Sequence, residues 1–342
     1  MTSSKVVAFR PARARTSTAE VLRVEEAPTA TLAAAVQAGL RSRQKTLPAA
    51  LLYDDLGSAL FEAITLLPEY EVTRADFRLI DRHAGDVADQ LEAPQVVELG
   101  PGAGKKAKRF LERYTNGGAV RFSAIDVSEA ALRDCQRTVE QLPNVTVSLV
   151  CARYLEGLQA VMASRSNQPM LVLFLGSNLS NFERPDAQRF LSAIRATLRP
   201  GDGLLLATDL DKAVEQLLPA YDDASGVTAA FDKNLLVRLN RELDADFDVR
   251  AFRHEARWSV PHRRIEMHLV ATRAMEVTVK ATGDVFHFDD GESLWTESSH
   301  RFRTDELRAW GTAAGFHTKA QWVDPSWAFA HTLFLAANGD ER

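Results

Sequence analysis

The stretch VVELGPGAGKK, residues 96–106, decides the fold of this 342-residue chain. Its first four residues, Val96–Leu99, predict a buried strand, and the glycines that follow predict a tight turn that opens a helix. Backbone N–H groups at the start of such a helix favour a nucleotide-like ligand. The spacing of the glycines then indicates which kind of ligand the turn suits.

Two phosphate-binding patterns fail on specific residues of this turn. A dinucleotide turn has glycines at its first, third and sixth positions, but the sixth position counted from Gly100 is Lys105. A phosphate loop has glycine at its first position and Ser or Thr at its last, where this chain has Leu99 and Lys106. The remaining pattern is E-x-G-x-G-x-G over residues 98–104, which is typical of enzymes that use S-adenosylmethionine. A strand–helix turn that binds no ligand is the alternative.

Asp126 adds a second signal for the same cofactor. It ends the apolar segment VRFSAID, 26 residues after Gly100, where an acidic side chain can accept hydrogen bonds from both ribose hydroxyls of an adenosyl group. A surface aspartate or a helix cap is the alternative. Together the two signals predict methyl transfer from a sulfonium donor that is already activated. The protein then has to align the acceptor and exclude water.

The order of elements predicts an α/β fold with a doubly wound sheet and ligands at the carboxyl ends of its strands. A terminal antiparallel strand pair, 316–324 and 327–337, is typical of methyltransferases, and about ninety residues of mixed helix and strand precede it. We therefore expect a class I methyltransferase sheet with an inserted α+β substrate domain. The expected boundaries are a disordered tail at 1–30, a cofactor domain at 71–211 and 300–342, and a substrate-recognition domain at 31–70 and 212–299.

Composition excludes several other classes. The net charge of −5 makes no electrostatic case for binding nucleic acid or an acidic membrane. The eight histidines are scattered without metal-ligand spacing, so no metal site is expected. Two cysteines, Cys135 and Cys151, do not suggest a disulfide framework, which favours a cytoplasmic protein. A monomer that acts on a small molecule is the expected state.

Four segments outside the glycine turn resemble the L-histidine Nα-methyltransferase family of ergothioneine biosynthesis. They are LLYDDLGSALFEAITLLPEYEVTR, AYDDASGVTAAFDKNLLVRLNRELDADFD, RIEMHLV and TESSHRF, and the resemblance covers nearly the whole chain from about residue 30. It implies a class I methyltransferase domain with an inserted second domain. It also implies three successive methylations of the α-amine of histidine, giving the betaine hercynine, with S-adenosylmethionine as cofactor.

The resemblance also implies roles for individual residues. Tyr53 borders the amine and the methyl donor and is the candidate for orienting the amine. The remaining candidates divide into cofactor-binding residues (Gly100, Gly102, Lys106, Asp126, Tyr154 and Gly176), residues for the amine and carboxylate of the substrate (Tyr70, Asn181 and Tyr221), and residues for its imidazole (Met267, Glu297 and Ser299). Taken without the family, the same side chains also fit packing, capping or solvated roles.

Two departures from the family pattern leave alternatives open. Arg153 stands where a carboxylate is common, which favours a cofactor-binding protein without catalysis. The loop GSNLSN, residues 176–181, is bulkier than the usual GSTIGN, which favours another aromatic amino acid as acceptor. A nicotinamide dehydrogenase is disfavoured by Lys105. No residue is an obvious base for the amine, so Tyr53 and solvent both remain candidates for taking its proton.

Overall fold

The computed structural model describes residues 21–23, 29–115 and 118–337. Its centre is an eight-stranded sheet in the order β1-β4-β3-β2-β5-β6-β13-β12. Pairing is parallel from β1 to β6 and antiparallel for the last two strands. The strands of this sheet are β1 (Val21–Arg23), β2 (Gln95–Leu99), β3 (Val120–Asp126), β4 (Val145–Cys151), β5 (Met170–Phe174), β6 (Gly203–Asp209), β12 (Phe316–Asp324) and β13 (Phe329–Ala336). The predicted doubly wound sheet with a terminal antiparallel pair is confirmed.

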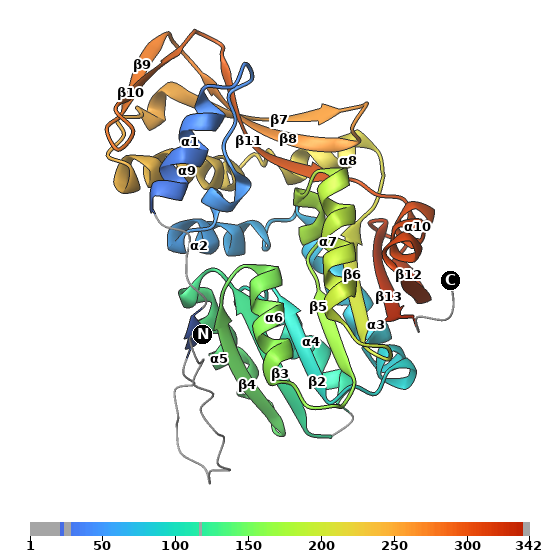
Figure 1. The fold of residues 1–342 in the computed structure, drawn as a ribbon. Coiled ribbons are helices and arrows are strands. Elements are labelled where there is room, and N and C mark those ends of the chain that lie inside the picture. The colour runs from blue at the N-terminus through green and yellow to red at the C-terminus, as the bar shows by residue number, and fades with distance from the viewer. Residues whose placement is uncertain (1–20, 24–28, 116–117, 338–342) are drawn as a thin grey trace.

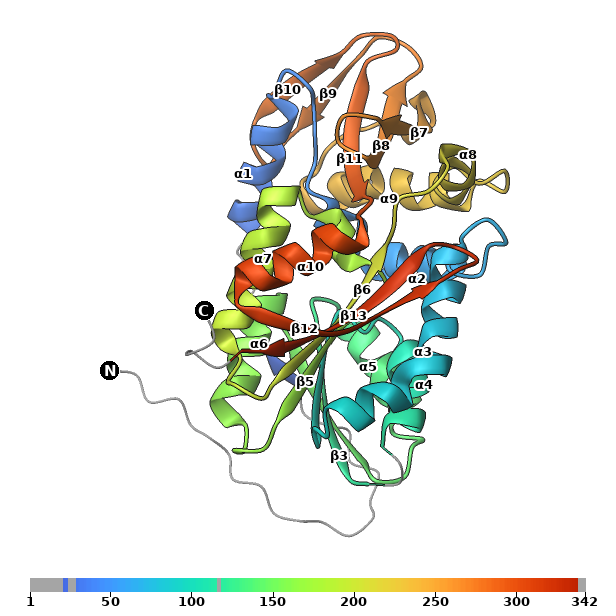
Figure 2. The same ribbon diagram turned by 90° about the vertical axis from the view of Figure 1, so that its right-hand side faces the viewer.

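Helices cover both faces of this sheet (Figure 2). One face carries α3 (Glu71–Gln90), α4 (Lys105–Tyr114) and α5 (Glu129–Val139), and the other carries α6 (Tyr154–Ser164), α7 (Arg184–Thr197) and α10 (Thr304–Ala314). Strands β2, β5 and β6 are buried along their whole length because helices lie on both sides of them. Strand β2 pairs with β3 on one side and β5 on the other, so the direction of winding reverses there and a crevice for a ligand opens at its carboxyl end.

A second set of elements lies beyond the carboxyl ends of the parallel strands (Figure 1). It contains an antiparallel sheet in the order β11-β8-β7 and a separate hairpin of β9 and β10. Its elements are α1 (Thr29–Leu40), α2 (Asp55–Ile64), α8 (Val214–Leu217), α9 (Val227–Glu242), β7 (Phe252–Ser259), β8 (Arg264–Ala271), β9 (Met275–Val279), β10 (Asp284–Phe288) and β11 (Ser293–His300). Helix α9 packs against β7 and β8, and α2 packs against α9. The division of the chain into domains at the expected boundaries stays a prediction.

The prediction of a disordered tail over residues 1–30 is wrong in two places. Val21–Arg23 form β1, which pairs in parallel with β4, so that Val21 lies opposite Leu149. The outer edge of β4 would otherwise present unpaired N–H and C=O groups, and a short strand satisfies them. Helix α1 also begins inside the predicted tail, at Thr29. The rest of that prediction, residues 1–20 and 24–28, lies outside the described residues.

Asp54 fixes the start of α2 and ties that helix to α9. Its side chain accepts a hydrogen bond from the backbone N–H of Gly57 at 2.8 Å, as an N-cap does. Asn234 and Arg241 of α9 donate to the same carboxylate, each at 2.7 Å. This contact places Tyr53, the preceding residue, against α9.

Among the described residues, no helix is long and apolar enough to span a membrane.

Candidate active site

The turn after β2 has a backbone that requires glycine. Gly100, Gly102 and Gly104 have φ angles of +72°, +54° and +74°, in the left-handed region that side chains with a Cβ rarely adopt. A Cβ on Gly104 would also lie 2.7 Å from the Sγ of Cys135. The N–H of Gly102 donates to Oδ2 of Asp126 at 3.4 Å, so the turn and the end of β3 face each other. The two cofactor signals found in the sequence therefore meet in space.

Two carboxyl groups flank this turn, the buried Glu98 and the partly buried Asp126. Asp126 accepts from the N–H of Ser128 at 3.0 Å as well as from Gly102, and burial raises its pKa while these bonds lower it. Burial raises the pKa of Glu98 to about 8, against the charge of Lys106. Within the described residues, Oε2 of Glu98 has no hydrogen-bond partner. A polar atom left unpaired beside a glycine cradle fits a ligand with hydrogen-bond donors, as an amino-acid ammonium has.

Lys106 is held by a buried aspartate that the sequence reasoning missed. Its Nζ lies 3.1 Å from Oδ2 of Asp76, which also accepts from the N–H of Gly176 at 2.9 Å. The other oxygen of Asp76 lies 2.6 Å from Nε2 of His331 on β13. A Cβ on Gly176 would lie 2.7 Å from Nζ of Lys106, so a larger residue at this position would clash with the lysine side chain. The signal in the sequence was Asp76 itself, a charge on the apolar stripe between Val72 and Ile80.

Tyr154 covers the other side of the turn. Its hydroxyl would lie 3.1 Å from a Cβ placed on Gly100, and its ring packs edge-on against Phe174 at 5.3 Å. The side-chain amide of Asn178 lies at 3.2 Å from the same Cβ position. Asn178 also lines the cavity described next, so the glycine turn and that cavity share a wall.

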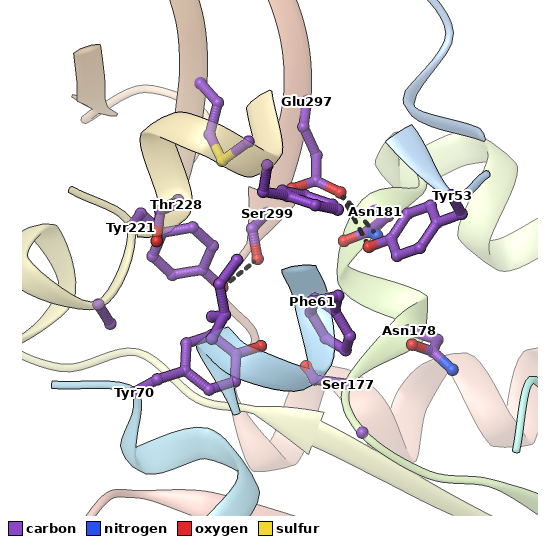
Figure 3. Close-up of a pocket in the computed structure, with 15 residues that line it drawn as sticks. Tyr53, Phe61, Tyr70, Ser177, Asn178, Asn181, Tyr221, Thr228, Glu297 and Ser299 are labelled. Atoms are coloured by element: carbon purple, nitrogen blue, oxygen red, sulfur yellow. Dashed lines mark hydrogen bonds between the residues drawn. The ribbon is translucent and has the colours of Figure 1, made fainter. Parts of the chain in front are cut away.

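A cavity that is open at its mouth lies between the carboxyl end of the large sheet and the smaller sheet (Figure 3). All seven residues predicted for the substrate or for orienting its amine line it. They are Tyr53, Tyr70, Asn181, Tyr221, Met267, Glu297 and Ser299. Residues that the sequence reasoning did not select also line it: Phe61, Ile64, Ser177, Asn178, Ala220, Thr228 and Phe231. Most of these lie inside the segments that carry the family resemblance, which is the signal that could have found them.

Glu297 is a buried acceptor in this cavity. The side-chain amide of Asn181 donates to its Oε1 at 3.2 Å, and the hydroxyl of Tyr53 donates to the same atom at 3.4 Å. Burial raises the pKa of Glu297 to about 8, and the charge of Asp232 acts in the same direction. Burial and the nearby Glu297 raise the pKa of Tyr53 well above its usual value, so this phenol stays protonated at neutral pH.

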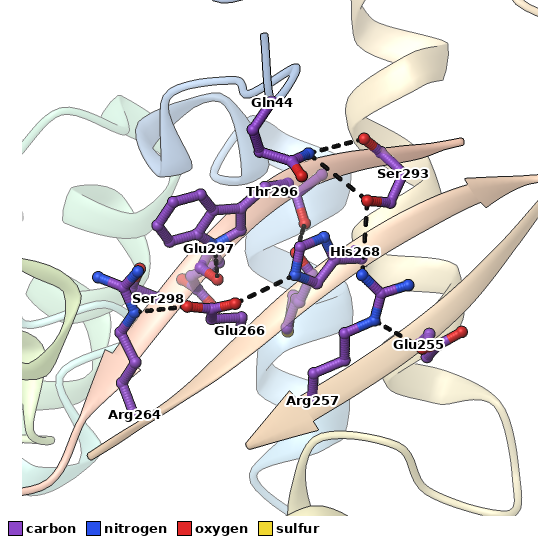
Figure 4. Close-up of polar contacts among 12 residues, drawn as sticks. Gln44, Glu255, Arg257, Arg264, Glu266, His268, Ser293, Thr296, Glu297 and Ser298 are labelled. Carbon is purple, nitrogen blue, oxygen red and sulfur yellow. Dashed lines mark hydrogen bonds and ion pairs between the residues drawn. The ribbon is translucent and has the colours of Figure 1, made fainter. Parts of the chain in front are cut away.

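A β-bulge in β11 turns Glu297 into the cavity. Trp295 pairs with His268 and Glu297 pairs with Met267, so Thr296 is an extra residue between them. Residues two apart in a regular strand share a face, but the bulge places Trp295 and Glu297 on opposite faces. On the far face, the ring of Trp295 stacks 6.2 Å from that of His268, which is labelled in Figure 4. The indole N–H of Trp295 donates to the carbonyl of Glu297 at 2.9 Å.

Aromatic rings form most of the remaining wall. The rings of Tyr70 and Tyr221 lie 6.3 Å apart, and Tyr53 packs edge-on against Phe61 at 5.8 Å and against Phe231 at 5.5 Å. The hydroxyls of Tyr221 and Ser299 are 2.8 Å apart. Faces of this kind attract cations by about 0.5–2 kcal/mol each.

The backbone of Tyr221 is anchored by a buried histidine. His254 has Nδ1 at 2.7 Å from Asp232 and Nε2 at 2.7 Å from the carbonyl of Tyr221. Burial acts to lower the pKa of His254, but Asp232 and the carbonyl outweigh it and the pKa is raised. A carbonyl accepts only, as does an ionised carboxylate, so both ring nitrogens of His254 donate.

In the described part of the chain, no cluster of three or more His, Cys, Asp or Glu side chains could hold a metal ion.

Known proteins match this chain over most of its length. The family described as histidine-specific, S-adenosylmethionine-dependent methyltransferase matches residues 32–336. Histidine N-alpha-methyltransferase of Mycobacterium tuberculosis is 39% identical over 87% of this chain and 92% of its own. Ergothioneine biosynthesis protein 1 of Schizosaccharomyces pombe is 31% identical over 77% of this chain and 35% of its own. Among solved structures, an S-adenosylmethionine-dependent methyltransferase from Clostridium acetobutylicum gives a TM-score of 0.43 at 11% identity, covering 83% of this chain and 97% of its own.

The strand order, the glycine turn and the acidic end of β3 define a class I methyltransferase that uses S-adenosylmethionine. The chain belongs to the family of histidine-specific, S-adenosylmethionine-dependent methyltransferases. It is therefore an amino-acid N-methyltransferase, as the sequence predicted.

Proposed function

We propose that this protein transfers three methyl groups from S-adenosylmethionine to the α-amine of free L-histidine, giving hercynine, the first step towards ergothioneine. The observation that carries the proposal is the position of Glu297, a buried carboxyl group in an aromatic cavity that shares Asn178 with the glycine turn. A cavity with a buried acceptor favours a ring that can donate a hydrogen bond, as an imidazole can and a phenyl ring cannot.

The cofactor would be held around the glycine turn and would supply an activated methyl group on a positively charged sulfur. Asp126 accepts from the ribose hydroxyls, and Tyr154 covers the adenine side. The turn at Gly100 and Gly102, together with Lys106 beside Gly176, holds the amino-acid end. The ammonium group at the amino-acid end of the cofactor would donate to the unpaired oxygen of Glu98, and the carboxylate at that end would pair with the ammonium of Lys106.

The acceptor would occupy the cavity of Figure 3, with its amine toward Asn178 and the glycine turn. We assign its amine and carboxylate to Tyr70, Asn181 and Tyr221, and its imidazole to Met267, Glu297 and Ser299. The bonds of 3.2 and 3.4 Å that Asn181 and Tyr53 make to Glu297 are long, and the substrate can replace them at low cost.

Each transfer forms one N–C bond and breaks one C–S bond, and each requires a nitrogen that has lost a proton. The acceptor enters as an ammonium and leaves as a trimethylammonium, so three protons are released. Tyr53 stays protonated and cannot serve as the base. Its hydroxyl orients the amine, and the protons leave to solvent. The product can no longer donate a hydrogen bond, but the rings of Tyr70 and Tyr221 still attract its positive charge.

The alternative acceptor is another aromatic amino acid, and the sequence of the 176–181 loop favoured it. The structure of this loop supports that alternative less. Ser180, the position where GSNLSN adds bulk to GSTIGN, is buried and does not line the cavity, and its hydroxyl lies 2.5 Å from that of Ser177. Leu179 replaces an isomeric isoleucine and is buried in the hydrophobic core. Asn178 is the changed residue that lines the cavity. Arg153 is the residue that suggested a cofactor-binding protein without catalysis. It is exposed at the start of α6 and does not line the cavity.

We propose a cytoplasmic enzyme that acts as a monomer on a free amino acid, with no nucleic acid or membrane partner. Its two cysteines, Cys135 and Cys151, are buried thiols, as a reducing compartment allows.

Incubation of the pure protein with S-adenosylmethionine and a mixture of all free amino acids, followed by mass spectrometry, tests this function. We expect histidine to gain three methyl groups while the other amino acids stay unchanged. The Asp126→Ala protein is the control, because it should form less product at limiting cofactor. Methylated tryptophan, tyrosine or phenylalanine in place of histidine would establish the second acceptor, and cofactor binding without any methylated product would leave a non-catalytic protein.

A further inference from the structure

Arg301 is a fully buried cation directly behind the cavity wall. It has no exposed surface and follows the last residue of β11. Its Nη1 donates to the hydroxyl of Ser299 at 2.9 Å, to the carbonyl of Ser299 at 2.9 Å and to the carbonyl of His300 at 3.1 Å. Its Nε lies 3.0 Å from Oδ2 of Asp209, at the end of β6. A buried guanidinium is costly unless such partners compensate it, so its retention calls for a reason.

The guanidinium of Arg301 contacts two residues that line the cavity. Its Cζ lies 5.2 Å from the centroid of the Tyr221 ring, and its Nη1 bonds the hydroxyl of Ser299. The same two residues are joined to each other through their hydroxyls at 2.8 Å. Arg301 therefore acts on the cavity through Tyr221 and Ser299 together, without lining it itself.

Counting hydrogens shows what this pair presents to a ligand. Tyr221 and Ser299 carry one hydroxyl hydrogen each, and the bond between them uses one of the two. Arg301 donates to Ser299 and so occupies a lone pair there. One hydroxyl hydrogen remains for the cavity, whichever of the two hydroxyls holds it. The pair thus offers a donor, and donor chains that begin at a cation are strengthened along their length.

The charges behind the pair also favour an anion. Asp209 pairs with both Arg301 and Lys212, so two cations share one carboxylate. Burial lowers the pKa of Lys212 to about 8, which leaves it mostly charged at neutral pH. Tyr70 and Tyr221 also face Arg301, and burial raises the pKa of both, so they stay neutral. The net charge of the cluster is positive. Glu297, on the same cavity, is largely neutral before a ligand binds.

We infer that Arg301 is a positioning residue that makes the enzyme select substrates with a free α-carboxylate, by holding Ser299 as the donor to Tyr221 so that the hydroxyl of Tyr221 donates to that group. The inference rests on the proposed function, because it takes the acceptor to be an amino acid in this cavity. The competing interpretation is that Arg301 only ties β11 to β6 through Asp209.

The two interpretations differ in how a variant treats ligands with and without the carboxylate. L-histidine and L-histidinol share the amine and the imidazole, but histidinol has a hydroxymethyl group in place of the carboxylate. We expect the wild-type enzyme to have a much lower KM for histidine than for histidinol. Arg301→Met should raise the KM for histidine about tenfold or more, since a charge-supported donor is lost, while the KM for histidinol changes little. The readout is the ratio of the KM for histidinol to the KM for histidine. Arg301→Lys keeps the charge and should therefore keep part of the wild-type ratio.

Two further variants keep the test decisive if Arg301→Met fails to fold. Ser299→Ala breaks the link to Arg301 without removing the buried charge, and it should reduce the same ratio. Arg165→Met is the matched control, because Arg165 is also buried in an ion pair, with Asp202, among residues that do not line the cavity. It should lower stability and leave the ratio at the wild-type value.

The outcomes separate this inference from the function on which it rests. A wild-type enzyme that does not methylate histidine at all would sink the proposed function, and this inference with it. The inference alone is overturned if the wild-type enzyme prefers histidine but the Arg301 and Ser299 variants raise the KM for histidine and for histidinol by equal factors. Arg301 would then only tie β11 to β6.

Discussion

Asn181 donates a hydrogen bond to Glu297 at 3.2 Å across 116 residues of sequence, and this contact joins the large sheet to the smaller one. Asn181 ends the 3-10 helix η2 (Asn178–Asn181), which follows β5. Glu297 lies in the antiparallel strand β11. Tyr53 reaches the same carboxyl oxygen from a third segment. The chemistry of the cavity therefore depends on how these three segments are packed together, and each can be tested separately.

Glu297→Ala should narrow or invert the preference for histidine over phenylalanine, whose ring cannot donate a hydrogen bond. The buried carboxyl group rewards a ring that donates a hydrogen bond, and polar discrimination of this kind can reach about 10⁴–10⁵ in kcat/KM. Met267→Leu is the matched variant, because an apolar wall discriminates by only about 1–3 kcal/mol. Steady-state kinetics across a panel of amino acids measure both. If Glu297→Ala keeps the wild-type order of preference, the imidazole binds elsewhere.

Glu297→Gln should change how stability depends on pH. The folded protein holds the proton of Glu297 up to a pKa of about 8, whereas the ordinary pKa of a glutamate is 4.5. The wild-type contribution is therefore fully present below the lower value and is lost as pH rises through the higher one. Relative to wild type, the free energy of unfolding of the variant should rise by up to about 5 kcal/mol over this interval. Denaturant titrations across the interval measure it. The same change at the exposed Glu276 should give a flat difference, and a flat difference for Glu297→Gln would show that the carboxyl is not desolvated.

Asp126→Ala should weaken S-adenosylmethionine binding. Loss of charge-assisted bonds to the ribose should cost about 1.5–3 kcal/mol, or roughly 10- to 100-fold in Kd. Asp126→Asn retains one acceptor oxygen and should lie between the variant and wild type. Asp289→Ala, at a side chain that is 81% exposed, is the control and should bind normally. Calorimetry on folded protein decides the matter, and an unchanged affinity for Asp126→Ala would remove the ribose assignment.

Tyr53→Phe should lower kcat more than it raises KM. The variant keeps the ring contacts with Phe61 and Phe231 and loses only the hydroxyl, which matters most in the reacting geometry. A loss of about tenfold in kcat corresponds to one hydrogen bond of about 1.4 kcal/mol. Tyr114→Phe is the control, since its hydroxyl bonds only the backbone at Leu91 and Ala93. A normal kcat for Tyr53→Phe would make Tyr53 a packing residue.

The sequence by itself determined the parts of this protein that depend on local spacing. The glycine turn after Val96–Leu99 requires left-handed backbone at Gly100, Gly102 and Gly104, and only glycine adopts it without strain. The alternation of apolar strands with amphipathic helices likewise predicts the sheet, because burial on one or both faces leaves its period in the sequence. The class of cofactor and the seven cavity residues could therefore be named before the fold was known, the latter through the family resemblance.

Only the tertiary structure decided how side chains from distant segments converge. Period-two alternation places Trp295 and Glu297 on one face of a strand, and the bulge at Thr296 reverses that. Nothing in the segment TESSHRF indicates that Arg301 is buried behind Tyr221, and the partners of Asp76 lie on other elements of the fold. Contacts of this kind depend on long-range packing, which a local pattern does not encode. The same packing converts a row of separate polar residues into one cavity with an acceptor, a donor and an aromatic wall.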